Sequence, residues 1–247
     1  MLGLPAALYG ATMIGAEEID APAVTALVIG LTLIIVFMLT ANRRQRPPIL
    51  DLRLLAIRRF RAATATCGLT GANMYAGLLL LPLYFQTSAG FDATTTGLLL
   101  LTLGLGSALV LPIAGALTDR HGPGLVSLAG VALLIVTTLP FLFTGTLSLT
   151  MLIALLILRG AGLALAQMPA MTGAYTAVSA RQMGDATTLV NIVQRIGGAL
   201  GAITVVVVLT QTGDAYRWAF AGLLIIALLN VIPALGMVSR REVMMRS

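Results

Sequence analysis

Charged residues are scarce in this chain: they make up 10% of its 247 residues, whereas a soluble domain carries about a quarter. Lysine is absent, so all 15 basic residues are arginines, and only nine residues are acidic. Hydrophobic residues make up 58% of the chain, and its mean hydropathy is +1.00. Water cannot be the solvent for most of such a surface. The composition therefore excludes an ordinary soluble domain and indicates a membrane protein.

Residues that carry out chemistry are equally few. The single cysteine, Cys67, cannot form an internal disulfide, and the single histidine, His121, is expected to be an ordinary loop residue. No carboxylate falls in the middle of an apolar run, and no nucleophile–base pair can be assembled within one. We therefore expect neither an enzyme nor a metal or cofactor site.

Seven apolar runs reach the roughly 20 residues that a helix needs to cross the hydrocarbon core. Their approximate limits are 21–40, 62–84, 95–117, 125–144, 148–170, 186–209 and 217–238. In lipid the backbone must satisfy its own hydrogen bonds, so we expect helices. The predicted fold is all-α, a polytopic membrane bundle of about seven transmembrane helices. Three parts are expected: the end of one span plus a linker helix at 1–41, a basic linker at 42–61 and a six-helix bundle at 62–247.

Arginine placement predicts the orientation in the membrane. Twelve arginines fall on one side of the predicted spans, seven of them in the 42–61 linker. The opposite side has only Arg217, together with five acidic residues. By the positive-inside rule, the side with twelve arginines is cytoplasmic. We expect a multi-pass protein of the cell membrane with loop 118–124 and the C-terminus in the cytoplasm, and loop 87–93 outside.

The basic linker 42–61 allows two interpretations. It can lie on the membrane surface with its arginines facing anionic lipid headgroups, or it can be a nucleic-acid-binding patch. The flanking spans already account for the charge, so the lipid bilayer is the expected partner and nucleic acid is not.

The short stretch GALTDRHG at 115–122 places Asp119 and Arg120 between two glycines, Gly115 and Gly122. The sequence predicts a tight cytoplasmic loop in which Asp119 caps or charges the start of the next helix and Arg120 pairs across the interface. Such charges at a helix–helix seam can latch one conformation. The stretch resembles the loop motif of the major facilitator superfamily, except that Pro123 and Gly124 replace the usual basic residue.

Three further stretches resemble the fourteen-span, EmrB/QacA-like branch of drug:proton antiporters in that superfamily: 78–101, 158–175 and 184–202. This resemblance implies the C-terminal half of a major facilitator fold. It also implies a role in proton-coupled export of small apolar or cationic compounds by alternating access between two halves. The opposite half would then be a separate N-terminal half or a homodimer partner. The alternative is a truncated or non-transporting membrane subunit.

Two arginines fall inside predicted spans. Arg159 lies near the middle of the run 148–170, where insertion of an arginine costs about 2.5–3.5 kcal/mol. It should therefore face the bundle interior, either on a substrate or proton path or as a structural residue bonded to neighbouring helices. Arg195 lies closer to the cytoplasmic side, and for it a structural or gating role competes with ligand contact.

Other polar or soft residues in the spans are candidates for an adaptable pocket, with ordinary packing as the alternative. They are Asn73, Tyr75, Gln167, Met171, Asn191 and Gln194. Gly197 and Gly201 have the spacing of a close helix contact or, alternatively, of a flexible point. Because no carboxylate lies at mid-membrane depth, any proton-coupling acid is expected in the other half, and this chain alone is not expected to perform coupled transport.

Overall fold

The computed structural model describes residues 51–143, 148–211 and 215–238. Within them every regular element is helical: η1 (Leu52–Ala56), α3 (Arg58–Leu83), η2 (Tyr84–Ser88), α4 (Ala93–His121), α5 (Pro123–Thr138), α6 (Pro140–Phe143), α7 (Leu149–Tyr175), η3 (Ala180–Gln182), α8 (Met183–Gln211) and α9 (Ala215–Met237). The turn η2 is π-helical and continues α3. Six stretches are long and apolar enough to cross a membrane. The all-α membrane fold predicted from the sequence is thereby confirmed.

Six of the seven predicted spans correspond to these stretches, with shifted ends. Helix α3 begins at Arg58, so the last four residues of the predicted linker 42–61 belong to the helix. Helix α7 continues to Tyr175, five residues past the predicted limit. Hydropathy underestimates these helices because their ends carry polar residues outside the hydrocarbon core. The predicted span 21–40 and the rest of 1–50 lie outside the described residues.

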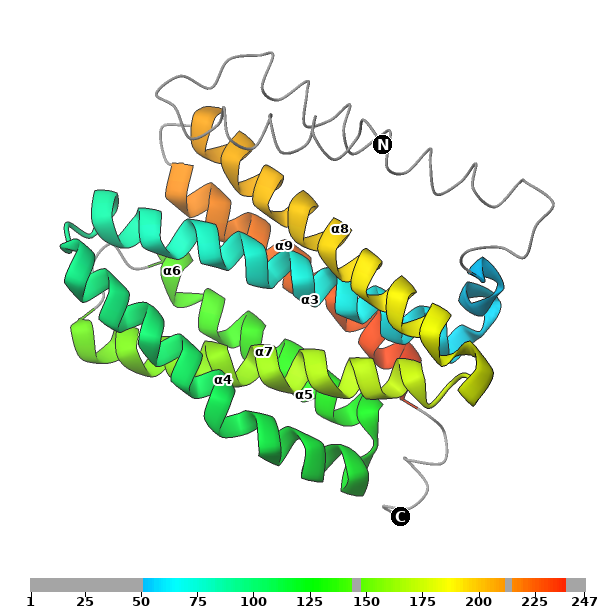
Figure 1. Ribbon diagram of the computed structural model, residues 1–247. Helices are drawn as coiled ribbons and strands as arrows, with labels where there is room; N and C mark the ends of the chain where they lie inside the picture. The colour runs from blue at the N-terminus through cyan, green and yellow to red at the C-terminus, as the bar shows by residue number, and fades with distance from the viewer. Residues whose placement is uncertain (1–50, 144–147, 212–214, 239–247) are drawn as a thin grey trace. The chain divides into compact units, whose positions relative to one another are not determined.

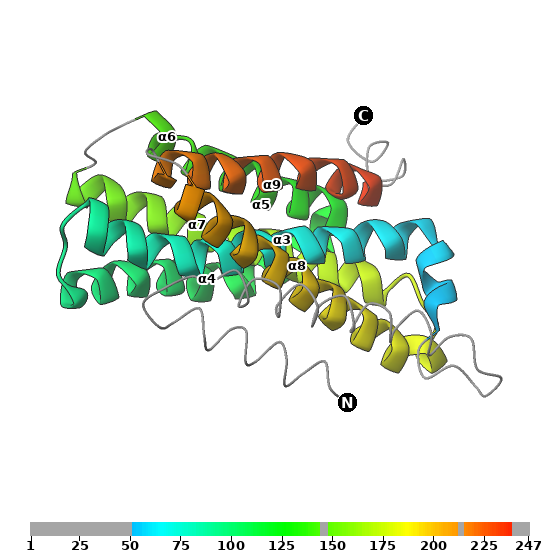
Figure 2. The same ribbon diagram turned by 90° about the horizontal axis from the view of Figure 1, so that it is seen from above.

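The helices of the compact unit Arg53–Ser247 form two layers. One layer runs in the order α8, α3, α7 and α4, and α9 and α5 pack behind α3 and α7 (Figures 1 and 2). We call the first of these the four-helix layer. Helix α3 is the most buried of the six spans, while α4 and α8 are the least buried. The central position of α3 and α7 makes their inward faces the place for polar contacts between helices.

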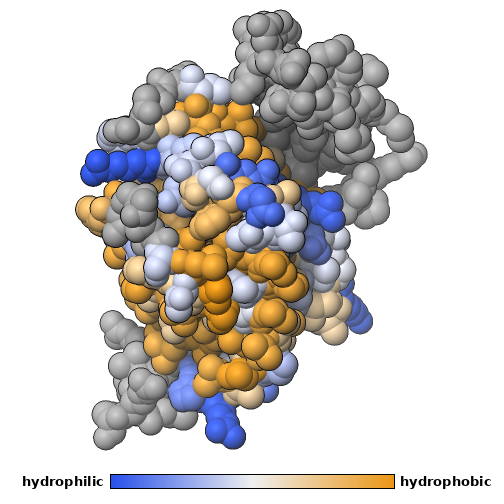
Figure 3. Space-filling model, turned by 90° about the vertical axis from the view of Figure 1, so that its left-hand side faces the viewer, coloured by the Kyte–Doolittle hydropathy of each residue, from blue (hydrophilic) through white to orange (hydrophobic). Residues whose placement is uncertain are grey.

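Apolar side chains cover much of the outside of the bundle. Figure 3 looks at the end where η2 and α6 lie, and most of the coloured surface there is apolar, with hydrophilic residues in separate patches. Leu109 of α4 is 68% exposed and Ile232 of α9 is 70% exposed. In water such a surface would be unfavourable, whereas lipid solvates it. At the same end Phe141 and Phe220 stack with ring centroids 4.7 Å apart.

Local signals in the sequence set the helix ends. Asp92 caps α4 by accepting a hydrogen bond from the Thr95 N–H at 3.1 Å, and Ser148 caps α7 in the same way through Met151. The hydrogen bonds from the Thr95 side chain and backbone hold the pKa of the Asp92 carboxyl below its usual range. These caps set where α4 and α7 begin.

The connection between α4 and α5 is shorter than the predicted loop 118–124. Helix α4 continues through His121, and Gly122 alone joins it to α5 with a φ of 81°, a conformation that glycine adopts freely. Proline at position 123 then starts α5. Asp119 and Arg120 therefore lie in the last turn of a helix and not in a loop, which corrects the prediction.

Glycines bring α3 and α8 into backbone contact. A Cβ atom on Gly197 would lie 2.1 Å from the carbonyl oxygen of Gly68, and one on Gly201 would lie 2.3 Å from that of Ala72. These distances are too short for any side chain. In a membrane the hydrophobic effect does not drive helices together, because lipid tails are also apolar. Van der Waals contact between closely packed backbones stabilises the helix pair instead.

We predict that Gly197→Ala separates α3 from α8 and costs about 1–3 kcal/mol of stability, as overpacking typically does. The matched control is Gly104→Ala in α4, where a Cβ would meet nothing within 4 Å. That change should be neutral or stabilising by about 0.5–1 kcal/mol, because alanine favours a helix. Thermal unfolding of the purified variants in one detergent provides the comparison. Equal melting temperatures for the two variants would contradict the close contact.

Candidate functional site

Arg159 lies deep inside the bundle. It occupies the third turn of α7, and only 2% of its surface is exposed. Space for the guanidinium exists because residue 77 of α3 is glycine: a Cβ there would lie 3.2 Å from Nη2 of Arg159. The side chain thus points from α7 towards α3, the most buried helix, and not towards lipid.

Three helices besides α7 take part in the hydrogen bonds around this guanidinium. Nη1 of Arg159 donates to Oγ1 of Thr138 in α5 at 2.7 Å, and Nη2 donates to Oδ1 of Asn73 in α3 at 2.7 Å. Asn73 in turn donates through Nδ2 to the carbonyl oxygen of Leu223 in α9 at 3.0 Å. The hydroxyl of Thr138 donates to the Leu134 carbonyl. We call Arg159, Asn73, Thr138 and the Leu223 carbonyl the Arg159 network.

The network holds a cation by means of neutral groups. Its two side-chain acceptors are an amide oxygen and a hydroxyl, and neither is a carboxylate. Asn73 and Thr138 are themselves fully buried. A buried charge is expensive unless its hydrogen bonds are satisfied. Each acceptor is therefore needed, and an anion or carboxylate that reached this point would be attracted strongly.

A second buried polar contact links α3 to α9. Nδ2 of Asn230 donates to Oγ1 of Thr70 at 2.9 Å, and both side chains are buried. Oδ1 of Asn230 has no partner among the described residues. Together with the Asn73–Leu223 bond, this contact fixes the rotation of α9 about its own axis relative to α3.

The predicted residues of α3 and α7 have different surroundings. Asn73 is engaged in the network, whereas Tyr75 is 42% exposed, with its ring lying where a side chain on Gly198 would be. Gln167 is half-buried, and both atoms of its amide are buried without a partner among the described residues. Met171 lies one turn further along the same face of α7 and is also half-buried. Gln167 thus differs from the other predicted residues in that its amide is buried and has no partner among the described residues.

The predicted residues of α8 are not part of the Arg159 network. Asn191 is exposed and donates to the Thr187 carbonyl of its own helix at 2.9 Å. Arg195 is also exposed. Gln194 is half-buried, and its carbonyl and side chain fill the space beside Gly71 of α3. Asn191 and Arg195 thus face outward, whereas Gln194 packs on α3.

The predicted latch residues lie at the end of α4. Asp119 and Arg120 are exposed, and neither side chain makes a hydrogen bond or ion pair with another residue of the described ranges. Asp119 does not cap α5, because the N-cap is Gly122 and makes no side-chain hydrogen bond. Gly115 faces α7, where a Cβ would meet the end of Met168 at 3.7 Å. The capping role predicted for Asp119 is wrong. Because α4 extends through His121, Asp119 lies within α4, three residues before the N-cap of α5.

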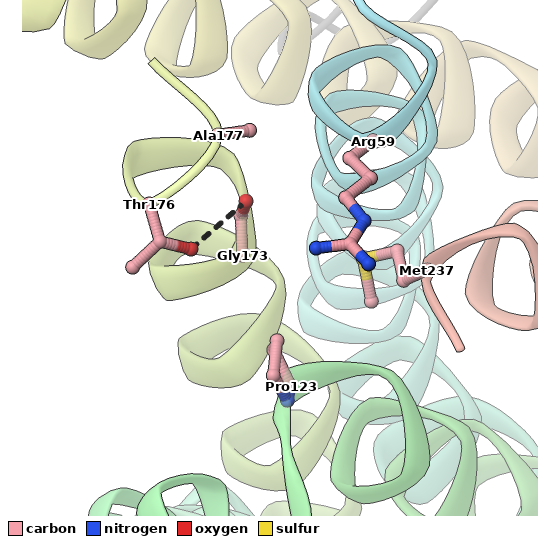
Figure 4. A pocket seen from close by; sticks show the side chains of 6 residues that line it. All are labelled: Arg59, Pro123, Gly173, Thr176, Ala177 and Met237. Carbon is pink, nitrogen blue, oxygen red and sulfur yellow. Dashed lines mark hydrogen bonds between the residues drawn. The ribbon is translucent and has the colours of Figure 1, made fainter. Parts of the chain in front are cut away.

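A small cavity lies at the end of the bundle where α3 and α5 begin and α7 and α9 end. Its volume is about 120 Å³, and Figure 4 shows its lining, which comprises Arg59, Pro123, Gly173, Thr176, Ala177 and Met237. The guanidinium of Arg59 reaches into the space between α7 and Met237 (Figure 4). A cation is favourable at the C-terminal end of a helix. Arg59, counted above as part of the linker, is thus positioned to interact with the end of α7.

Sequence reasoning missed Thr138, which belongs to the Arg159 network, and Gly77, which leaves space for the guanidinium. Thr138 and Gly77 were not candidates, since threonine and glycine are common in membrane helices. The usable signal was the buried arginine itself, because its guanidinium requires acceptors on neighbouring helices. The many threonines of the spans left the identity of those acceptors open. Among the described residues there is no group of three His, Cys, Asp or Glu side chains that could hold a metal ion.

Comparison with known proteins places this architecture in a family. The profile of the Major Facilitator Superfamily matches residues 1–202 and, in a second match, 63–244. An uncharacterized MFS-type transporter, YhcA of Bacillus subtilis, is 28% identical over 212 residues, which are 85% of this chain and 40% of that protein. A multidrug resistance protein B homolog of Mycobacterium tuberculosis is 31% identical over 192 residues, 76% of this chain and 35% of that protein.

A lincomycin resistance protein, LmrB of Listeria monocytogenes, is 28% identical over 171 residues, 68% of this chain and 36% of that protein. The chain thus spans 40% or less of the length of these three curated relatives.

We predict that Asn73→Leu destabilises the protein by about 1–3 kcal/mol, because it removes the acceptor of Nη2 of Arg159 and leaves that N–H of a buried cation unpaired. The double variant Asn73→Leu/Arg159→Met should lose less than the sum of the single variants, since the unpaired charge is then absent. Chemical unfolding in detergent measures the cycle.

The control for this cycle is Gln167→Leu, which removes two buried amide atoms that have no partner. Its stability should equal or exceed that of the parent. Strict additivity of the Asn73 and Arg159 substitutions would show that the two side chains are not coupled.

Proposed function

Because this chain belongs to the major facilitator superfamily, we propose that it takes part in exporting small apolar or cationic compounds across the cell membrane. Two kinds of observation support this proposal. Relatives in two genera are named for multidrug or lincomycin resistance. In the chain itself, Gln167 has a buried amide with no partner among the described residues, and this is the observation on which the proposed binding role rests.

The proposed binding surface lies on the four-helix layer. Tyr75, Gln167, Met171 and Gln194 come from three adjacent helices of that layer, α3, α7 and α8. Aromatic and thioether groups adapt to ligands of varied shape, and an amide oxygen accepts a hydrogen bond from a cationic amine. A binding surface of this kind suits apolar or cationic compounds better than anions.

Alternating access requires a second wall. In carriers built from repeats, the substrate binds between two bundles that rock against each other. The chain would supply one bundle, and either an N-terminal half or a second copy would supply the other. The exposed Asp119 and Arg120 at the end of α4 would latch one of the two arrangements, with Gly115 and Gly122 permitting close approach.

Proton coupling would depend on the opposite half. No described residue within the six spans is a carboxylate apart from Asp119 and Asp185, which lie at helix ends. A carboxylate from the other half could approach the Arg159 network and compete with Asn73 and Thr138 for the guanidinium. Protonation of that carboxylate would release Arg159 to its neutral acceptors. The network, as the structure has it, fits the state in which no carboxylate is bound.

The binding role of Gln167 is tested with ethidium, a lipophilic cation that carries amine donors. We predict that Gln167→Leu lowers the affinity of the purified protein for ethidium by about tenfold, the effect of losing one hydrogen bond to a polar or charged group. Gln86→Leu, the same substitution at an exposed position of η2, is the matched control. Fluorescence anisotropy provides both affinities. Equal ethidium affinity of the two variants would show that Gln167 does not contribute to binding.

The proposed orientation is tested by cysteine labelling in a Cys67→Ser background. Ala89 and His121 are exposed and lie near opposite ends of α4. A membrane-impermeant maleimide added to intact cells should label Ala89→Cys and leave His121→Cys unlabelled until the cells are permeabilised. The reverse pattern would invert the topology and place the C-terminus outside.

A further inference from the structure

A groove runs between α3 and α9 on the outside of the bundle. Its volume is about 560 Å³, and its lining includes Arg58, Arg61, Ala62, Ala65, Leu69 and Ile232. The groove is widely open and mostly apolar. It is a hollow because small residues line the contact between the two helices: a Cβ on Gly236 would lie 3.3 Å from that of Ala62.

Charge is confined to one end of this α3–α9 groove. Arg58 and Arg61 lie in the first turn of α3, three residues apart and hence on one face of the helix. Beyond them every lining residue is apolar as far as Leu69, which is about 12 Å further along at 1.5 Å per residue. Both arginines are exposed. The groove thus has two arginines at one end and an apolar floor of about 12 Å, which is most of the roughly 15 Å hydrocarbon thickness of one leaflet.

We propose that the α3–α9 groove binds a phospholipid with an anionic headgroup. The guanidinium groups of Arg58 and Arg61 would bind the phosphate, for which the planar guanidinium fork is well suited. One acyl chain would lie over Ala62 and Ala65 and against Ile232. The ligand is therefore an amphiphile whose negative headgroup meets the two arginines and whose apolar chain lies on the apolar floor.

Charge complementarity favours a lipid over other occupants. A free phosphate would use the arginines and leave the apolar floor empty, and an apolar helix would fill the floor and leave two cations unpaired. The neighbouring Arg59 reaches into the end cavity (Figure 4), so it does not line the groove. The arginine-rich end also fits the cytoplasmic leaflet, whose anionic lipids attract basic residues near the membrane surface.

The test is native mass spectrometry of the delipidated 247-residue protein with phosphatidylglycerol or phosphatidylcholine of identical acyl chains. The parent should retain one phosphatidylglycerol in preference to phosphatidylcholine. Arg58→Gln/Arg61→Gln should lower phosphatidylglycerol affinity by about 25-fold, or about fivefold for each arginine near the membrane surface. Arg181→Gln, which removes one exposed charge from η3 at the same end of the bundle, should bind like the parent.

A second variant tests the apolar part of the groove. Ala65→Phe should lower the retention of both lipids, because its ring fills the floor without changing the charge. Equal binding of the two lipids by the parent would overturn the proposal, and so would an Arg181→Gln loss as large as that of the double variant. Ala65→Phe could instead leave lipid binding unchanged and lower the melting temperature in lipid-free detergent. That result would mean that another part of the protein already fills the groove, and it would also overturn the proposal.

Discussion

Contact between helix backbones is the constraint on which this bundle depends. Where α4 crosses α7, a Cβ on Gly160 would lie 2.0 Å from the carbonyl oxygen of Leu103, and one on Gly106 would lie 2.1 Å from that of Ile157. Lipid tails are as apolar as leucine, so burying leucine between helices gains little free energy in a membrane. Dispersion contacts between closely packed backbones, together with interhelical hydrogen bonds such as that from Ser107 to the Gly160 carbonyl, take its place.

The same close approach makes a buried arginine possible. Gly77 leaves space beside α3, and the guanidinium of Arg159 occupies that space and reaches acceptors on two helices. Because the acceptors are neutral, the positive charge of the site is not cancelled. The Arg159 network joins four helices, α3, α5, α7 and α9, in this arrangement. It also leaves a buried positive charge that is paired with neutral groups alone among the described residues.

The outer surface differs between the two layers. On the four-helix layer, exposed polar side chains such as Tyr75, Asn191 and Arg195 interrupt the apolar residues. On the side of α9, exposed residues such as Ile232 are apolar and suit lipid. Between α3 and α9 this lipid-facing surface is hollowed and ends at Arg58 and Arg61. The two sides therefore differ in polarity and in shape.

The sequence by itself determined the six described spans and the all-α membrane class, because hydropathy is a local property that adds up along the chain. It also placed Arg159 at a depth where lipid exposure is too costly. Only the tertiary structure decided that Asn73 and Thr138 accept its hydrogen bonds, since Asn73 lies 86 positions away in the chain. It also extended α4 over Asp119. Such pairings depend on how far each helix is rotated and shifted against its neighbours, which hydropathy leaves open.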